Sequence, residues 1–146
     1  MADPAYLASV ALPDMAPPEV LERSRNGSEV VTRVLYRYTG SLESWAAKLI
    51  RADQLDWEQE TSLDLERHEG LFVILPRSYG GLLSCSGAYR FEEEGDSTVR
   101  TTTGELVVRV PLVSARAERK VAGGMLRRMD AEADQLRRWL ATPNSR

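Results

Sequence analysis

The side chains that most often perform proton transfer or bind metals are scarce in this sequence. His68 is the only histidine and Cys85 the only cysteine. His68 lies in a polar turn, so we expect neither a Ser-His-Asp triad, nor a Cys-His pair, nor a multi-histidine metal site. A free cysteine is among the most frequently buried residue types, and we expect Cys85 to behave as a small core side chain. The sequence therefore predicts no catalytic residue, no metal site and no cofactor.

A second set of polar side chains is of more interest, because alternation along predicted strands places them on the apolar face. These residues are Tyr36, Tyr38, Gln59, Thr61 and Tyr89, joined by Arg100 if its strand keeps a regular register. A buried polar side chain needs a hydrogen-bonding partner. Two interpretations remain open: the set orients the polar end of a ligand in an apolar pocket, or its members satisfy one another.

Period-two alternation predicts the strands that carry these residues. The Asn26-Gly27 pair between residues 19–24 and 28–38 is typical of a β-hairpin. Residues 56–66 place acidic side chains on the opposite face from Gln59 and Thr61, and we expect that acidic face to lie outside. Further strands are predicted at 71–75, 83–92 and 98–112, separated by short polar or glycine-containing turns.

Two helices are predicted, a short one at 41–51 and a long one at 114–142. Apolar residues recur every three or four positions along the long helix, at Ala117, Val121, Met125, Met129, Ala133, Leu136 and Leu140. Met125 and Met129 are interpreted either as pocket lining or as ordinary core packing. Residues 1–18 contain four prolines and are predicted to form an irregular segment with at most a short helical turn.

These elements indicate one α+β domain over residues 1–146, in which a curved antiparallel sheet packs against the long C-terminal helix. The length of 146 residues and an apolar fraction of 42% fit a globular domain. With one cysteine the fold must do without a disulfide, and we expect a cytoplasmic location. No apolar run is long enough to span a bilayer, and the N-terminal residues do not resemble a targeting signal.

The formal net charge of −3 argues against a nucleic-acid partner, but the charge is unevenly distributed. From Arg116 onward, eight Lys and Arg residues stand against four Asp and Glu, whereas the preceding residues are acidic overall. The basic side chains are interpreted as the solvated face of an amphipathic helix, with binding of phosphate or lipid headgroups as the alternative.

Several segments resemble an actinobacterial family of unknown function in the START-like superfamily, also called SRPBCC or helix-grip. The likeness is carried by residues 104–113, by 117–119, by the helix end at 137–140, by 3–6 and by the Asn-Gly hairpin. It implies a cavity between sheet and helix that holds an apolar small molecule or lipid without catalysis. A cyclase- or dehydratase-like enzyme, or a protein-interaction module, are the alternatives. The family has no assigned ligand.

Domains of this superfamily usually begin with a strand and a helix before the position that Asp3 matches, and both are missing here. We expect either an upstream start or a cavity that is open where the strand would sit. An unpaired sheet edge can pair with a second chain, so we expect weak self-association into a homodimer. Residues 71–75 are apolar on both faces, which predicts that Phe72 and Ile74 lie on the outer face, either as an interface or covered by another segment.

Overall fold

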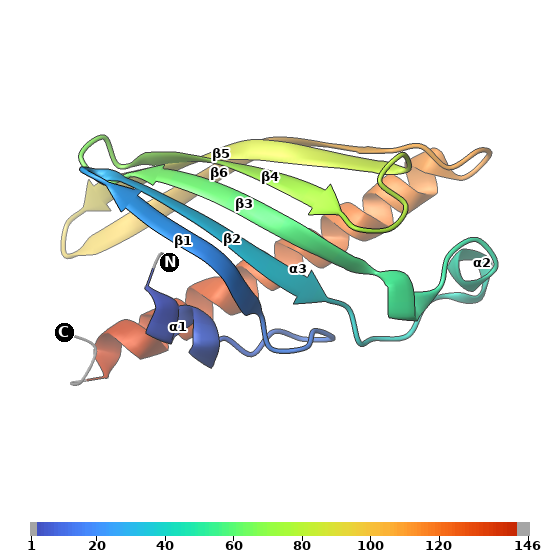
Figure 1. Ribbon diagram of the computed structural model, residues 1–146, viewed down its shortest axis with the longest axis horizontal. Coiled ribbons are helices and arrows are strands. Elements are labelled where there is room, and N and C mark those ends of the chain that lie inside the picture. Colours follow the sequence, from blue (N-terminus) through green and yellow to red (C-terminus); the bar gives the residue numbers. More distant parts are fainter. Residues whose placement is uncertain (1–2, 143–146) are drawn as a thin grey trace.

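The structure is a computed structural model that describes residues 3–142, and it consists of one antiparallel sheet with helices on a single face (Figure 1). The parts of the predicted domain at residues 1–2 and 143–146 lie outside the described residues. Six strands follow one another in both sequence and space: β1 (Glu19–Asn26), β2 (Glu29–Arg37), β3 (Asp56–Asp64), β4 (Glu69–Pro76), β5 (Leu83–Glu94) and β6 (Ser97–Val108). The α+β arrangement predicted from the sequence is confirmed.

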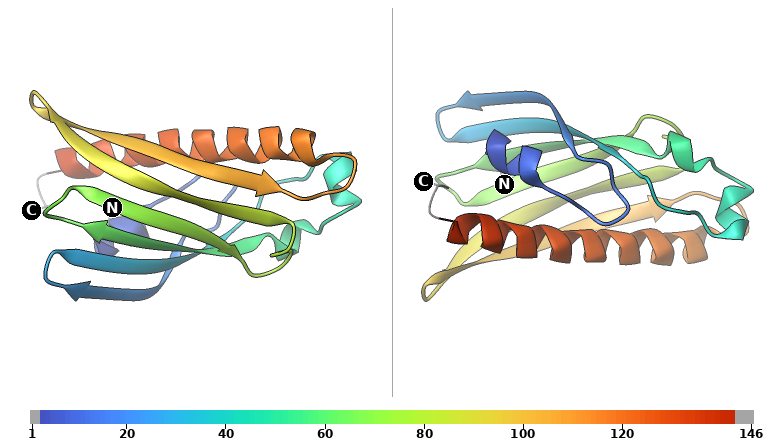
Figure 2. Two further views of the ribbon diagram at one scale, coloured as in Figure 1. Left: turned by 90° about the horizontal axis from the view of Figure 1, so that it is seen from above. Right: turned by 90° about the horizontal axis from the view of Figure 1, so that it is seen from below.

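The long helix α3 (Ser114–Ala141) crosses the inner face of the sheet, and it agrees with the predicted helix within one residue at its C-terminus. The N-terminal helix α1 (Pro4–Ser9) lies on the same side of the sheet as α3 (Figure 2). Asp3 caps α1 by accepting hydrogen bonds from the backbone N–H groups of Ala5 and Tyr6. The sheet thus grips two segments that come from opposite ends of the chain.

The hairpin at Asn26-Gly27 is confirmed, with the turn centred one residue later than expected. Asn26 pairs with Glu29, which leaves Gly27 and Ser28 as the two loop residues. Gly27 has φ of 60°, a left-handed conformation that glycine adopts without steric cost. Gly95, in the turn between β5 and β6, has the same left-handed conformation, with φ of 60°.

The predicted helix at 41–51 is wrong in extent. Only Ser44–Ala47 (α2) is α-helical, followed by a short 3-10 turn, η1, at Ala52–Gln54. Leu49, within the predicted helix, is 51% exposed. The segment lies beyond the end of the sheet (Figure 1), so its apolar side has no surface against which a longer helix could be stabilised.

The strand predicted at 98–112 ends earlier, at Val108. Pro111 cannot donate a backbone hydrogen bond, and residues 111–113 form the turn into α3. Leu112, the last residue of the predicted strand, is fully exposed at 105% and has φ of 70°. The strand therefore ends four residues before its predicted end.

The outward orientation predicted for Phe72 and Ile74 is also wrong. Phe72 and Ile74 are 5% and 7% exposed, whereas Leu71 is 65% exposed. The pairing of Thr61 with Phe72 explains the difference, because directly paired residues lie on the same face of a sheet and Thr61 faces inward. The outer apolar row of β4 consists instead of the exposed Leu71 and Leu75 with the half-buried Val73 between them.

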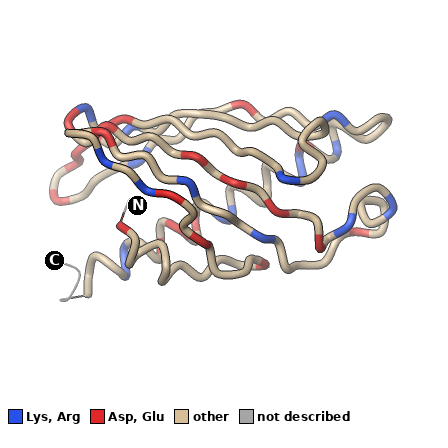
Figure 3. The backbone as a smooth tube through the Cα atoms, in the orientation of Figure 1, with Lys and Arg blue, Asp and Glu red and all other residues tan. Residues whose placement is uncertain are grey.

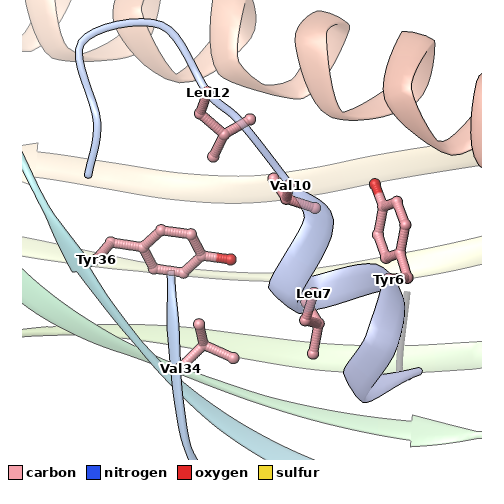
Figure 4. Packing of buried hydrophobic residues seen from close by; sticks show 6 residues of the cluster. All are labelled: Tyr6, Leu7, Val10, Leu12, Val34 and Tyr36. Atoms are coloured by element: carbon pink, nitrogen blue, oxygen red, sulfur yellow. The ribbon is translucent and has the colours of Figure 1, made fainter. Parts of the chain in front are cut away.

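The core divides into two apolar clusters. One contains the N-terminal segment, with Tyr6, Leu7, Val10 and Leu12 against β2 and the C-terminal half of α3 (Figure 4). The other lies under β3, β4 and β5 and is built on Leu63, Phe72, Ile74, Cys85 and Tyr89. Trp57 packs against both.

Candidate functional site

A group of charged and polar side chains lies between the sheet and α3, where it joins the two apolar clusters. Arg128 and Glu132 point from α3 toward the sheet, with side chains only 10% and 17% exposed. Arg100 reaches the same place from β6 and is 17% exposed. Buried ionised groups require compensating partners, so the arrangement of these three side chains decides what the interior can bind.

Glu132 lies between the two arginines. Its Oε1 is 3.3 Å from Arg128 Nε, and its Oε2 is 3.9 Å from Arg100 Nη1. Two guanidinium groups therefore contact one carboxylate in a partly desolvated region. Guanidinium groups in a low-dielectric site attract anionic or strongly accepting groups.

Residues of β3 and β5 extend this cluster across the sheet. Arg128 Nη2 donates to Gln59 Oε1 at 2.6 Å, and Gln59 Nε2 lies 3.3 Å from the Tyr89 hydroxyl and 3.4 Å from Thr61 Oγ1. Arginine forms charge-assisted hydrogen bonds with such amide oxygens, and these are stronger than neutral ones. Gln59 thus couples the charged helix residues to the polar residues predicted on β3 and β5.

Aromatic rings enclose the arginines. The Arg128 guanidinium lies 4.8 Å from the centroid of the Tyr36 ring and 5.9 Å from that of Trp57, and the two rings stack on each other. Arg100 lies 5.6 Å from the ring of Tyr89. Cation–π contacts of this kind partly offset the loss of water around a guanidinium.

Two buried donors in the cluster have no hydrogen-bonding acceptor among the described residues. They are Trp57 Nε1 and Arg128 Nε, since the Glu132 carboxylate near Arg128 Nε does not have hydrogen-bond geometry. Unsatisfied buried N–H groups are rare in folded proteins. Each of these N–H groups can donate to an oxygen atom of a ligand.

A cavity of about 40 Å³ adjoins the cluster and is lined by Tyr6, Leu7, Val10, Thr32, Val34, Tyr36, Gln59, Thr61, Leu63 and Glu132. A space of that size holds about three water molecules, well below the roughly 300 Å³ at the lower end of small-molecule pockets. A larger hollow of about 560 Å³ lies mostly over outward-facing residues of β3 to β6, among them Leu71, Ala88 and Thr101. Of the predicted ligand-binding residues, only Tyr89 borders that outer hollow.

The tyrosine hydroxyls of the interior remain protonated over the physiological range. Burial raises the pKa of Tyr36 and of Tyr89 above that of a free tyrosine, and the negative charge of Glu132 adds to both shifts. The pKa of Tyr6 is raised for the same two reasons. These groups can donate hydrogen bonds to a ligand, but they are poor general bases at neutral pH.

The structure brings together five of the eight residues predicted to bind a ligand: Tyr36, Gln59, Thr61, Tyr89 and Arg100. Tyr38 does not join them. It lies beyond the end of β2, where its hydroxyl donates to the Ser41 carbonyl at 3.0 Å. Met125 packs in the second apolar cluster, with its sulfur 4.0 Å from Cys85 Sγ, and Met129 belongs to neither cluster.

The apolar repeat of α3 does not indicate that Arg128 and Glu132 lie inside. Its member Leu136 packs against the first apolar cluster, but the repeat through Met129 and Ala133 leads to Leu140, which is 68% exposed. The inward face after Met125 continues instead through Arg128, Glu132, Gln135 and Trp139. The i,i+4 spacing of Arg128 and Glu132 was the available signal, but such pairs are usually solvated.

Gln135 holds the N-terminal segment against α3. Its Oε1 accepts from the Ala11 backbone N–H at 2.9 Å, and its Nε2 donates to the Ala11 carbonyl. The Tyr6 hydroxyl donates to the Glu132 carbonyl at 3.2 Å. The residues predicted as an irregular segment therefore form one wall of the cavity.

Fold and site together define the class of this protein: an α+β domain in which an open antiparallel sheet encloses a charged cluster beneath one long C-terminal helix. The chain belongs to the family described as "Protein of unknown function (DUF2505)", whose model matches residues 1–140. No curated protein matches it.

A solved structure shares the fold, the crystal structure of the protein TTHA0849 from Thermus thermophilus. It has a TM-score of 0.56 and 18% sequence identity, over 90% of this chain and 75% of that chain. At this identity the likeness shows the fold alone. Among residues 3–142, no helix is long and apolar enough to cross a membrane, and no group of His, Cys, Asp and Glu side chains could hold a metal ion.

Proposed function

We propose that the chain binds an amphipathic small molecule or lipid between the sheet and α3, with the ligand's polar end at Arg128 and its apolar body along the neighbouring core. The observation that carries the proposal is the buried cluster of two arginines and one carboxylate. An acidic or accepting group of a ligand would supply the acceptor that Trp57 Nε1 and Arg128 Nε lack, next to the ion pair of Arg128 with Glu132. No catalytic step is proposed.

The family's membership of the START-like superfamily is part of the same proposal. It is supported by the six-stranded sheet and the C-terminal helix on its inner face. The small cavity requires that binding displace α3 or the N-terminal segment, because about 40 Å³ cannot hold such a molecule. Ligands can select a more open conformation when they bind it more tightly than the closed one.

Two measurements test the proposal. Native mass spectrometry of the purified protein should show a co-bound small molecule. Fluorescence titration should then compare a fluorescent long-chain fatty acid with its methyl ester. Replacing Arg128 by Met should weaken binding of the acid about tenfold or more, because a charge-assisted hydrogen bond is lost, and should affect the ester much less.

Arg127→Met is the matched control, since Arg127 is an exposed neighbour on the same helix. It should leave both affinities unchanged. The proposal is wrong if no molecule co-purifies and neither probe binds. Equal losses for acid and ester in Arg128→Met would show that Arg128 supports packing and does not recognise a polar end.

A weak homodimer is a second proposal, favoured by the open edges of the sheet. Among the described strands, β1 pairs only with β2 and β6 only with β5, so each presents one unpaired row of backbone groups. Such edges can extend a sheet into a second chain. Light scattering at increasing concentration should show a rising mean mass, whereas a constant monomer mass would contradict the dimer.

A further inference from the structure

The two ends of the elongated sheet carry opposite charge (Figure 3). The three hairpin turns, at residues 24–30, 64–70 and 91–98, contain eight Asp and Glu but only two Arg. At the other end, residues 39–55, 77–82 and 109–120 contain seven Lys and Arg against three Asp and Glu. These last three segments are called the basic end below.

The segments of the basic end are joined into one surface by polar contacts. Glu43 forms an ion pair with Lys120 at 2.6 Å and lies 4.0 Å from Arg116. These contacts connect residues 39–55, called the α2 loop below, to the first turns of α3. The Arg109 backbone N–H donates to the Leu82 carbonyl at 2.7 Å. The seven cationic side chains therefore lie at one end of the molecule, where Arg51 also pairs with Asp53 and Arg77 with Glu58. They exceed the acidic residues of these segments by four, and fields from such a group add over several ångströms.

Apolar side chains protrude from the same surface. Leu112 is fully exposed, at 105%, and its φ of 70° is a conformation that non-glycine residues seldom adopt. Leu49, on the α2 loop, is 51% exposed. Trp45 is half-buried, with the Arg116 guanidinium 5.2 Å from its ring centroid. Exposed leucines among cations have no evident role in the stability of the monomer.

From these features we infer that the basic end docks on the surface of an anionic lipid bilayer. Lys and Arg side chains are attracted to the negative headgroups, and Leu112 and Leu49 enter the boundary between headgroups and acyl chains. The positive end of the α3 dipole points to the same surface. This is peripheral binding, and it is independent of what the interior holds.

The chemistry favours a lipid surface over a nucleic acid, since protruding leucines have no complementary partner on a phosphate backbone. The acidic hairpin end would at the same time be repelled from the bilayer. The charge asymmetry therefore orients the molecule with its long axis away from the membrane and with the α2 loop and the start of α3 toward it. An acidic protein would be attracted by the same charges, and the test separates the two.

Co-sedimentation with vesicles tests the docking. Vesicles of phosphatidylcholine with about 30% phosphatidylserine should retain the protein at low salt, and vesicles of phosphatidylcholine alone should not. Removing two exposed cations with Arg109→Ala and Arg119→Ala should weaken binding by about 30-fold, at roughly fivefold per residue. Leu112→Ser should weaken it about tenfold, because a leucine no longer enters the bilayer.

Matched controls come from the opposite end of the molecule. The double variant Arg25→Ala and Arg67→Ala removes the same charge from the hairpin turns, and Leu140→Ser removes a leucine of α3 that is 68% exposed. Both should bind the anionic vesicles as the wild type does. Failure of the wild type to bind, equal binding to neutral vesicles, or equal weakening by the controls would each overturn the inference.

Discussion

Replacing Glu132 by Gln should destabilise the protein by about 3 kcal/mol, because the change removes the carboxylate that Arg100 and Arg128 share while keeping the shape of the side chain. At an effective dielectric constant of about 20, charges about 4 Å apart attract by about 4 kcal/mol. The two ion-pair distances are 3.3 and 3.9 Å. Part of that attraction offsets desolvation, and removing one partner of a buried pair typically costs about 3–5 kcal/mol.

The assay is urea unfolding followed by tryptophan fluorescence, which gives the free energy of unfolding from the linear extrapolation. Asp134→Asn is the control on the same helix. Asp134 pairs with Arg137 at 2.7 Å, but its side chain is 62% exposed, and such surface pairs contribute about 1 kcal/mol or less. The difference between the two variants isolates the effect of burial.

Adding Arg128→Met to Glu132→Gln should recover about 1 kcal/mol or more, since one of the two cations that lost the Glu132 carboxylate is then removed. The reasoning is refuted if Glu132→Gln costs no more than Asp134→Asn. It is refuted equally if the double variant is no more stable than Glu132→Gln alone, because the arginines would then not depend on the carboxylate.

Two further predictions concern alkaline pH and close packing. Burial raises the pKa of Tyr36 and Tyr89 in the folded protein, so these hydroxyls ionise at a lower pH in the unfolded chain than in the folded one. The free energy of unfolding should therefore fall as pH rises above about 10. Replacing both tyrosines by Phe should make the free energy of unfolding fall less steeply with pH, as measured by urea unfolding at several pH values. An unchanged pH dependence would contradict the prediction. Gly87→Ala should lower stability by about 2 kcal/mol or more, because a Cβ there would lie 2.7 Å from the Phe72 ring. Gly81→Ala, where nothing lies within 4 Å, should be nearly neutral by thermal unfolding.

The sheet could be predicted from the sequence because alternation and turn residues are local signals. The inward positions of Gln59, Thr61 and Tyr89 followed from period-two patterns and are confirmed by their burial. On β4 that signal failed, since a strand with apolar residues on both faces has no contrast to read. Only pairing with β3 placed Phe72 inside and Leu71 outside.

The charged part of the site could not be predicted for a different reason. A search for the buried side of a helix selects apolar residues, and Arg128 lies inside because Gln59, Tyr36 and Glu132 together replace its water. Those partners come from three different elements. Likewise, nothing local in residues 3–12 indicates that they face Gln135 across the whole chain.

The contact between the N-terminal segment and α3 has a consequence for the order in which the protein forms during synthesis. Tyr6 and Glu132 are separated by 126 positions in the chain, so their contact can form only after α3 has been synthesised. Contacts between such distant residues slow folding because the loop must close before they form. Tyr6, Leu7, Val10 and Leu12 therefore remain without their α3 partners until that helix has been synthesised, and apolar surface that stays exposed for that time is prone to aggregate.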